Sequence, residues 1–199
     1  MTVGVSEALA SDPKADLRAT ALAARDALSP DMRAAAAETI AARQFPIGIP
    51  AGVIVSGYSP MRSELSPLPL MRKFAEAGAQ LALPVVQKRG QPLVMRAFAL
   101  GDELARGQWG IREPKPDAPE VFPDIMLVPL AAFDRAGHRI GYGAGYYDIT
   151  IASIRAMKPV MTVGLAFAAQ EIDKVPATPR DERLDLVLTE REVIDLRRT

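Results

Sequence analysis

The segment DIMLVPLAAFDRAGHRIGYGAGYYD, residues 124–148, places a short apolar run ahead of a glycine-rich loop. Residues 125–128 are apolar throughout, which is typical of a strand buried on both faces of a parallel sheet. Pro129 is expected to end that strand, and a helix is expected to follow the glycines over residues 146–157. Strand, loop and helix in this order are the repeating unit of α/β proteins.

Helices are expected on both sides of this unit. Leucine and alanine recur at helical spacing from Leu17 to Leu28, which predicts an amphipathic first helix. The triplet Ser29-Pro30-Asp31 combines a capping side chain, a first-turn proline and an acid, so a second helix is expected from there to about Arg43. A third helix is expected from Ser66-Pro67 to Gly78.

Short apolar runs alternate with these helices and predict the other strands. A connector with four prolines, residues 114–123, is expected to be stiff and extended. The alternation indicates a three-layer α/β/α domain with a largely parallel, mixed sheet. The whole chain, 1–199, is expected to be one domain, with residues 1–12 a loose leader. The expected strands are 52–56, 81–83 with an end at Pro84, 93–99, 160–166 and 186–188.

Composition narrows the class of protein. Hydrophobic residues make up 49% of the 199 residues, which is enough for a sizeable core, and the chain has no cysteine. Disulfides, cysteine zinc sites and thiol nucleophiles are therefore excluded. Lys+Arg and Asp+Glu both count 24, and a zero net charge argues against a nucleic-acid partner. No apolar run is long enough to span a membrane and no secretory signal is visible, so a cytoplasmic protein is expected.

The loop after the strand has the composition of an anion-binding nest. Four of the chain's 14 glycines fall within 137–145, and glycine adopts the positive φ that turns successive N–H groups toward one point. The N-terminus of the following helix adds positive potential, and Arg139 adds a donor pair suited to phosphate. Tyr146 and Tyr147 favour a flat organic substrate, although Tyr147 is equally compatible with the core.

Two standard nucleotide motifs do not fit this loop. A P-loop needs Lys-Ser/Thr after the last glycine, where this chain has Tyr146-Tyr147. The dinucleotide fingerprint needs Gly-x-Gly-x-x-Gly directly after a strand, and here the spacing is Gly-x-Gly-x-Gly after a longer loop. From the residues alone, an ordinary glycine-rich turn packed against tyrosines remains an alternative.

Residues 124–134 together with 137–148 resemble the signature of the 5-formyltetrahydrofolate cyclo-ligase family, also called 5,10-methenyltetrahydrofolate synthetases. Further matches follow the family's order, so the resemblance runs from about residue 14 to 190. Three residues depart from the family pattern: Ala144, Ile149 and Arg180. The matching segments are KADLR at 14–18, RDALS at 25–29, YSPMRSE at 58–64, WGIREP at 109–114, VGLAFAAQ at 163–170 and residues 181–189.

The resemblance implies an enzyme with the NagB/RpiA/CoA transferase-like fold that acts on a small molecule, 5-formyltetrahydrofolate. Its cofactors would be ATP and Mg²⁺, its product 5,10-methenyltetrahydrofolate, and its state a monomer. The formyl oxygen would be phosphorylated first, after which N10 closes the ring and phosphate leaves. Such a reaction needs positioning and charge neutralisation more than a protein nucleophile.

The resemblance also implies roles for individual residues. Lys14, Arg18 and Arg139 would be catalytic and hold the ATP phosphates, and Asp148 and Asp181 would hold Mg²⁺ through hard oxygen ligands. The nucleotide would also contact Gly141, Tyr142, Gly143, Ala144, Gly145, Tyr146 and Tyr147. The folate would contact Ser59, Glu64, Trp109 and Tyr146.

Each of these residues also has an ordinary structural interpretation, such as a solvated helix face for Lys14 and Arg18 or a helix cap for Asp148. Three other functions stay open from the sequence. The chain could be a paralogue of the same fold that acts on another pterin or phosphorylated metabolite. It could be a non-catalytic protein that binds nucleotide or folate, although both expected magnesium carboxylates are present. A nucleic-acid module is disfavoured by the zero net charge.

Overall fold

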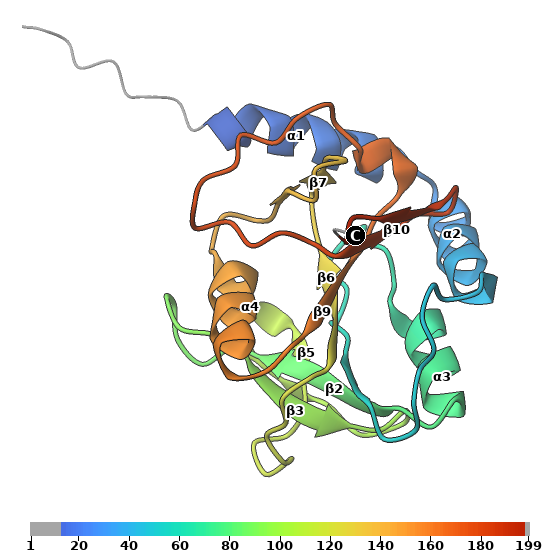
Figure 1. Cartoon of the computed structure of the whole chain (residues 1–199), viewed down its shortest axis with the longest axis vertical. Coiled ribbons are helices and arrows are strands. Elements are labelled where there is room, and N and C mark those ends of the chain that lie inside the picture. Colours follow the sequence, from blue (N-terminus) through green and yellow to red (C-terminus); the bar gives the residue numbers. More distant parts are fainter. Residues whose placement is uncertain (1–12, 198–199) are drawn as a thin grey trace, which may run out of the picture.

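The computed structural model describes residues 13–197. Its centre is a seven-stranded sheet in the order β11-β10-β9-β6-β1-β2-β3 (Figure 1). The five inner strands are parallel, and the two edge strands, β3 and β11, run antiparallel to their neighbours. The predicted mixed, largely parallel sheet is therefore confirmed. The sheet strands are β1 (Ile54–Ser56), β2 (Gln80–Val85), β3 (Val94–Phe98), β6 (Ile125–Pro129), β9 (Met161–Leu165), β10 (Leu186–Leu188) and β11 (Val193–Asp195).

Helices cover both faces of the sheet, which confirms the three layers (Figure 1). Alternate residues of β6 face opposite cores, because successive side chains of a strand point to opposite sides. Ile125 and Leu127 pack with α2 (Pro30–Ala42) and α3 (Leu68–Glu76). Met126 and Val128 pack with α4 (Tyr146–Met157).

The helix boundaries follow the local signals in the sequence. Ser29 caps α2 by accepting a hydrogen bond from the Met32 N–H, 3.2 Å away, as expected from the Ser-Pro-Asp triplet. Helix α4 has the predicted bounds and is preceded by the N-cap Gly145, whose φ of 70° is the left-handed conformation that glycine supplies. Within residues 13–197, no helix is both long enough and apolar enough to cross a membrane.

Helix α1 (Pro13–Asp26) lies apart from the two main cores and packs across small elements at one end of the sheet (Figure 1). Its Ala21 joins a separate apolar cluster with Ala132, Ile140 and Val175. This contact brings the N-terminal part of the chain beside the glycine-rich loop. The small elements are β7 (Ala132–Phe133), β8 (Arg139–Ile140) and the 3₁₀-helix η2 (Ala168–Gln170).

The prediction that Pro84 ends the second strand is wrong. Strand β2 continues through Pro84, which faces Met95 of β3, to Val85. Pairing with β1 stops at Ala82, so the missing N–H of Pro84 leaves no ladder bond unmade on that side.

The proline-rich connector is expected to be extended throughout, but its first part turns at residues 115–118, where the Ala118 N–H donates to the Lys115 carbonyl at 3.0 Å. The part from Pro119 on is extended and runs along the outer edge of β3. Hydrogen bonds join Ala97 N to Pro119 O and Val121 N to Met95 O, each at 2.8 Å. The connector thus covers an edge that would otherwise expose unpaired backbone groups. It follows a hairpin of β4 (Ala105–Arg106) and β5 (Arg112–Glu113), with the 3₁₀-helix η1 (Gln108–Gly110) between the two strands.

Candidate active site

A cavity of about 570 Å³ lies at the carboxyl ends of the parallel strands. The chain leaves β1 toward β2 on one side, whereas β6 leads to β9 on the other, so the direction of winding reverses between β1 and β6. Ligands of open α/β sheets bind at such a reversal. The cavity is lined there by Tyr58 after β1, Pro84 of β2 and Pro129 of β6.

The cavity brings together almost every residue proposed for the site. Segments far apart in the chain supply them: α1, the loop after β1, the glycine-rich loop with the start of α4, and the turn before β10. Trp109 lies in η1, but its side chain is outside what the structure describes. The expected residues that line the cavity are Lys14, Arg18, Ser59, Glu64, Arg139, Gly141, Tyr142, Gly143, Ala144, Gly145, Tyr146, Tyr147, Asp148 and Asp181.

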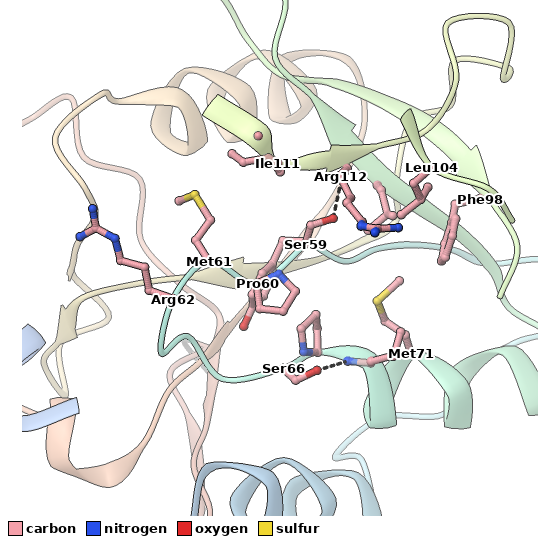
Figure 2. A pocket seen from close by; sticks show the side chains of 15 residues that line it. Ser59, Pro60, Met61, Arg62, Ser66, Met71, Phe98, Leu104, Ile111 and Arg112 are labelled. Atoms are coloured by element: carbon pink, nitrogen blue, oxygen red, sulfur yellow. Dashed lines mark hydrogen bonds between the residues drawn. The ribbon is translucent and has the colours of Figure 1, made fainter. Parts of the chain in front are cut away.

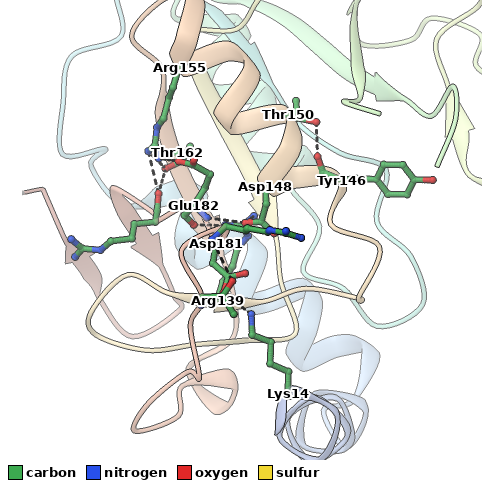
Figure 3. A network of polar contacts seen from close by, with 12 residues as sticks. Lys14, Arg139, Tyr146, Asp148, Thr150, Arg155, Thr162, Asp181 and Glu182 are labelled. Carbon is green, nitrogen blue, oxygen red and sulfur yellow. Dashed lines mark hydrogen bonds and ion pairs between the residues drawn. The ribbon is translucent and has the colours of Figure 1, made fainter. Parts of the chain in front are cut away.

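One side of the cavity, here called the charged wall, consists of Lys14, Arg18, Arg139, Asp148 and Asp181. Figure 3 shows its ion pairs converging from both ends of the chain. Lys14 Nζ lies 2.7 Å from Asp181 Oδ2, and Arg139 Nη2 lies 2.8 Å from Asp148 Oδ1. Arg18 Nε donates to the Gly141 carbonyl at 2.7 Å. Two ion pairs and one bond to the backbone therefore tie α1 to the 178–182 turn, the glycine-rich loop to α4, and α1 to the glycine-rich loop.

Backbone bonds fix the two carboxylates further. Asp148 Oδ1 also accepts the Glu182 N–H at 3.0 Å, and Asp181 Oδ2 accepts the Thr178 N–H at 2.6 Å. Burial acts to raise the pKa of Asp181, but the bonds from Lys14 and Thr178 outweigh it and lower that pKa. Asp181 is thus held as a carboxylate.

The two carboxylates suit a magnesium ion. In the described bonds each uses a single oxygen, Oδ1 of Asp148 and Oδ2 of Asp181, which leaves the second oxygen of each side chain for a ligand. Residues 13–197 contain no cluster of three or more potential metal ligands. Mg²⁺ is commonly held by one or two carboxylates together with phosphate oxygens and water, so two carboxylates match its usual protein ligands.

A second part of the cavity lining, here called the tyrosine wall, consists of Tyr58, Glu64, Tyr142 and Tyr147. Burial, followed by the nearby Glu64, raises the pKa of all three tyrosines, so their hydroxyls stay protonated. Glu64 is 8% exposed; its Oε2 accepts the Met61 N–H at 2.7 Å. Its Oε1 is buried and accepts no hydrogen bond of good geometry within residues 13–197, although the Tyr142 hydroxyl lies close enough to act on the carboxyl group. A buried carboxylate oxygen without a donor is costly, which makes Glu64 a candidate acceptor for a ligand.

Burial is also the main influence on the carboxyl group of Glu64, and it raises the pKa. The Met61 N–H, Tyr142 and the Arg25 guanidinium act in the opposite direction without cancelling it. Within one cavity, the structure therefore holds Asp181 with a lowered pKa and Glu64 with a raised one. Environments that differ in this way are typical of functional sites.

Two of the expected site residues have structural bonds of their own. The Ser59 hydroxyl donates to the Arg112 carbonyl at 2.6 Å and so ties the loop after β1 to β5. The Tyr146 carbonyl accepts from Thr150 Oγ1 at 2.6 Å, and the Tyr146 ring points away from the ion pairs (Figure 3). Tyr147 packs against the core on the α4 side of the sheet, in agreement with its second interpretation.

Two buried charged residues of the site were not assigned from the sequence. Glu113 is 5% exposed and lines the cavity, and a Cβ on Gly107 would lie 2.1 Å from its carboxylate carbon, so any side chain at 107 would displace the Glu113 carboxylate. Arg25 is 2% exposed and contacts Tyr142. The sequence offers a signal for Arg25, because it follows Lys14 and Arg18 on the same helical face.

A second cavity of about 690 Å³ adjoins the first (Figure 2). Tyr58, Ser59, Met61, Arg62 and Ile111 line both cavities. Arg62 has a φ of 53°, the one positive φ of a non-glycine residue within 13–197. Such a conformation is uncommon outside glycine and often marks a functional loop. The two cavities therefore lie side by side, separated by residues that line both.

Comparisons with known proteins agree with this geometry. The model of the 5-formyltetrahydrofolate cyclo-ligase family matches residues 10–190. A 5-formyltetrahydrofolate cyclo-ligase of Mycolicibacterium smegmatis is 35% identical over 155 residues, which cover 73% of this chain and 78% of the relative. One from Escherichia coli is 33% identical over 135 residues, covering 65% and 74%. The solved 5,10-methenyltetrahydrofolate synthetase of Aquifex aeolicus is 27% identical, superposes with a TM-score of 0.76 and covers 94% of each chain.

Proposed function

The chain belongs to the 5-formyltetrahydrofolate cyclo-ligase family and is an enzyme of that family, and we propose that it uses ATP and Mg²⁺ to cyclise 5-formyltetrahydrofolate to 5,10-methenyltetrahydrofolate. The observation that carries the proposal is that one cavity holds both a charged wall suited to phosphates and a buried carboxylate suited to a pterin. We also infer that residues 1–199 act as one cyclo-ligase domain. Its monomeric state and cytoplasmic location stay predictions.

The reaction is proposed to proceed in two steps. The γ-phosphoryl group passes from ATP to the formyl oxygen, which turns a poor leaving group into phosphate. N10 then forms a bond to the formyl carbon and loses its proton, and the C–O bond breaks with release of phosphate. ADP and phosphate are the other products. Neither step requires a nucleophile from the protein, in keeping with a cavity that no cysteine lines.

The charged wall would bind the phosphates. Lys14 and Arg18 approach from α1, and Arg139 from β8, so positive charge lies on more than one side of a bound triphosphate. Donors placed where negative charge accumulates are what phosphoryl transfer requires. The positive N-terminal end of α4 would add to them. Asp148 and Asp181 would hold Mg²⁺, which neutralises phosphate charge when bound.

The tyrosine wall would bind the folate. The free Oε1 of Glu64 can accept N–H donors of the pterin ring, and Ser59 lies on the same loop. Tyr142 and Tyr146 offer aromatic surface, and Trp109 is proposed to do the same. The rest of the folate would extend past Ile111 into the adjoining cavity (Figure 2).

The proposal is tested by mixing the protein with ATP, Mg²⁺ and 5-formyltetrahydrofolate and following the absorbance of the methenyl product. Product is expected in the complete mixture and not when ATP is left out or replaced by an analogue with a non-transferable phosphate. A folded protein that binds ATP and yet forms no methenyl product would contradict the proposed function.

A further inference from the structure

Helix α1 presents a single row of residues to the site. Lys14, Arg18, Ala21 and Arg25 are spaced by four, three and four positions, which places them on one face of a helix. Lys14 and Arg18 belong to the charged wall, and Ala21 packs in the small apolar cluster. Arg25, one turn further on, has no assigned role in the proposed reaction.

Arg25 bridges two loops with one guanidinium group. Its Nε donates to Ser63 Oγ at 2.9 Å, and its Nη1 donates to the Tyr142 hydroxyl at 2.5 Å. Ser63 immediately precedes Glu64, and its hydroxyl donates to Asp26. Tyr142 lies between Gly141 and Gly143 of the glycine-rich loop. Arg25 therefore joins the loop proposed to bind folate to the loop proposed to bind nucleotide.

The surroundings of Arg25 are unusual for a cation. The residue is 2% exposed, its two side-chain hydrogen bonds go to neutral hydroxyls, and within residues 13–197 its charge acts on the buried Glu64 carboxyl group without a direct ion pair. Every buried charge loses its hydration, and a direct ion pair offsets part of that loss. A guanidinium bonded to neutral hydroxyls lacks this offset, so its burial costs more free energy. A neutral side chain of similar size would fill the same space at a lower cost. Packing alone therefore does not account for an arginine at this position.

Arginine has the geometry that the bridge needs. Its guanidinium is planar and its Nε and Nη1 donors point in fixed directions, so it can hold two acceptors at once. Its Cζ also lies 5.7 Å from the centre of the Tyr142 ring, within the range of a cation–π contact. Arg18 secures the same loop one residue earlier, at Gly141. Tyr142 is thus held from α1 while its side chain reaches the neighbourhood of Glu64.

We propose that Arg25 is a positioning residue that couples the two halves of the site, so that nucleotide and folate each strengthen the binding of the other. This inference rests on the proposed function. A nucleotide that orders the glycine-rich loop would set Tyr142, and through Arg25 and Ser63 it would set the position of Glu64. By thermodynamic linkage, folate bound at Glu64 must favour nucleotide binding by the same factor.

The test is a binding cycle measured by isothermal titration calorimetry. The ligands are 5-formyltetrahydrofolate and, with Mg²⁺, an ATP analogue whose terminal phosphate cannot be transferred. In the wild-type protein, the nucleotide is expected to bind about tenfold more tightly when folate is present, a typical coupling factor. In Arg25→Lys and in Tyr142→Phe the factor is expected to fall close to one. Lysine keeps the charge but cannot hold Ser63 and Tyr142 together.

The coupling factor is a ratio, so a uniform loss of affinity in a variant does not change it. Arg33→Lys is the matched control, because Arg33 lies on α2 and donates to the Leu28 carbonyl at 3.2 Å, outside the cavity. Its factor is expected to equal that of the wild type. If Arg25→Lys does not fold, Tyr142→Phe still removes the hydroxyl that accepts from Arg25. Because that hydroxyl also contacts Glu64, Ser63→Ala is measured beside it: this change breaks the other end of the bridge, leaves Tyr142 in place, and should also bring the factor close to one.

The outcomes separate this inference from the proposed function. A wild-type factor near one, or a wild-type factor retained in Tyr142→Phe, would overturn the inference even if the enzyme forms the methenyl product. Coupled binding that is lost in the variants, in a protein that forms no product, would support the bridge and contradict the proposed reaction. A wild-type protein that binds neither ligand would contradict both.

Discussion

On the charged wall of the cavity, Lys14 and Arg139 lie in ion pairs with Asp181 and Asp148, whereas on the tyrosine wall Glu64 is buried with one oxygen unbonded. The first arrangement keeps charges in place with charges of opposite sign, and ligands must compete with these partners. The second removes a carboxylate from water and leaves its bonding capacity for a ligand. The two walls thus differ in how their side chains are bonded before a ligand binds. Substitutions on the charged wall should mainly lower the rate, whereas a substitution of Glu64 should mainly weaken folate binding.

Removal of the Arg139 guanidinium is expected to have the largest effect on catalysis. Arg139→Gln should lower kcat by about 10²–10³, because a fixed donor for the transferring phosphoryl group is lost. The rate of methenyl formation at saturating ligand concentrations measures this. Arg135→Gln is the control, since Arg135 pairs with Glu171 and Glu192 on the exposed surface. A wild-type rate in Arg139→Gln would remove this residue from the proposed chemistry.

Replacement of Glu64 tests the tyrosine wall. Glu64→Gln should raise the KM for the folate by about 10–100-fold, which is the loss expected for a hydrogen bond to a charged acceptor. The KM for ATP should change much less. An unchanged folate KM would mean that the pterin binds elsewhere in the cavity.

The same substitution should make the protein more stable at neutral pH. Since burial raises the pKa of Glu64, the folded protein holds this proton more tightly than the unfolded chain. The contribution of Glu64 to stability is then complete below its unfolded pKa and is lost as the pH rises through its folded pKa. Thermal melts at several pH values should show Glu64→Gln with the higher Tm at neutral pH and no difference in acid. A lower Tm for Glu64→Gln at neutral pH would contradict this account.

Asp181→Asn should have a smaller effect, limited to the Mg²⁺ concentration that the enzyme needs. An amide oxygen is a weaker ligand than a carboxylate, so the Mg²⁺ concentration for half-maximal rate should rise about tenfold. Titration of Mg²⁺ at fixed ATP measures this, and Asp195→Asn, on the exposed edge strand, is the control. If the two variants need the same Mg²⁺ concentration, Asp181 does not hold the metal.

Ala144→Gly should have the smallest effect. Ala144 departs from the family pattern, but it does not have a positive φ, so its backbone conformation is open to alanine. Glycine there should lower stability by no more than about 1 kcal/mol, through the greater freedom of the unfolded chain. Turnover should stay near the wild-type rate. A large gain in nucleotide affinity would show that alanine distorts the loop.

Local patterns in the sequence predicted the caps, strands and helix ends that are set by residues close together in the chain. The Ser29 cap, the apolar run of β6 and the glycine before α4 all act within a few residues, and the structure confirms the elements they predict. The residues of the site were identified instead from segments that match a family pattern, in the same order, along most of the chain. Those matches identified Lys14 and Asp181 as site residues although 167 positions separate them.

Only the tertiary structure decided what depends on distant partners. Strand β2 passes through Pro84 because β1 no longer pairs with it there, which no local pattern could indicate. Arg25 and Glu113 are charged residues that a sequence alone places on the surface, and only the packing of α1 and of Gly107 buries them. The sequence by itself thus determined the kinds of element and the chemical groups of the cavity. The tertiary structure decided which of those groups lie paired and which lie buried without a partner, because hydration is lost only where distant segments meet.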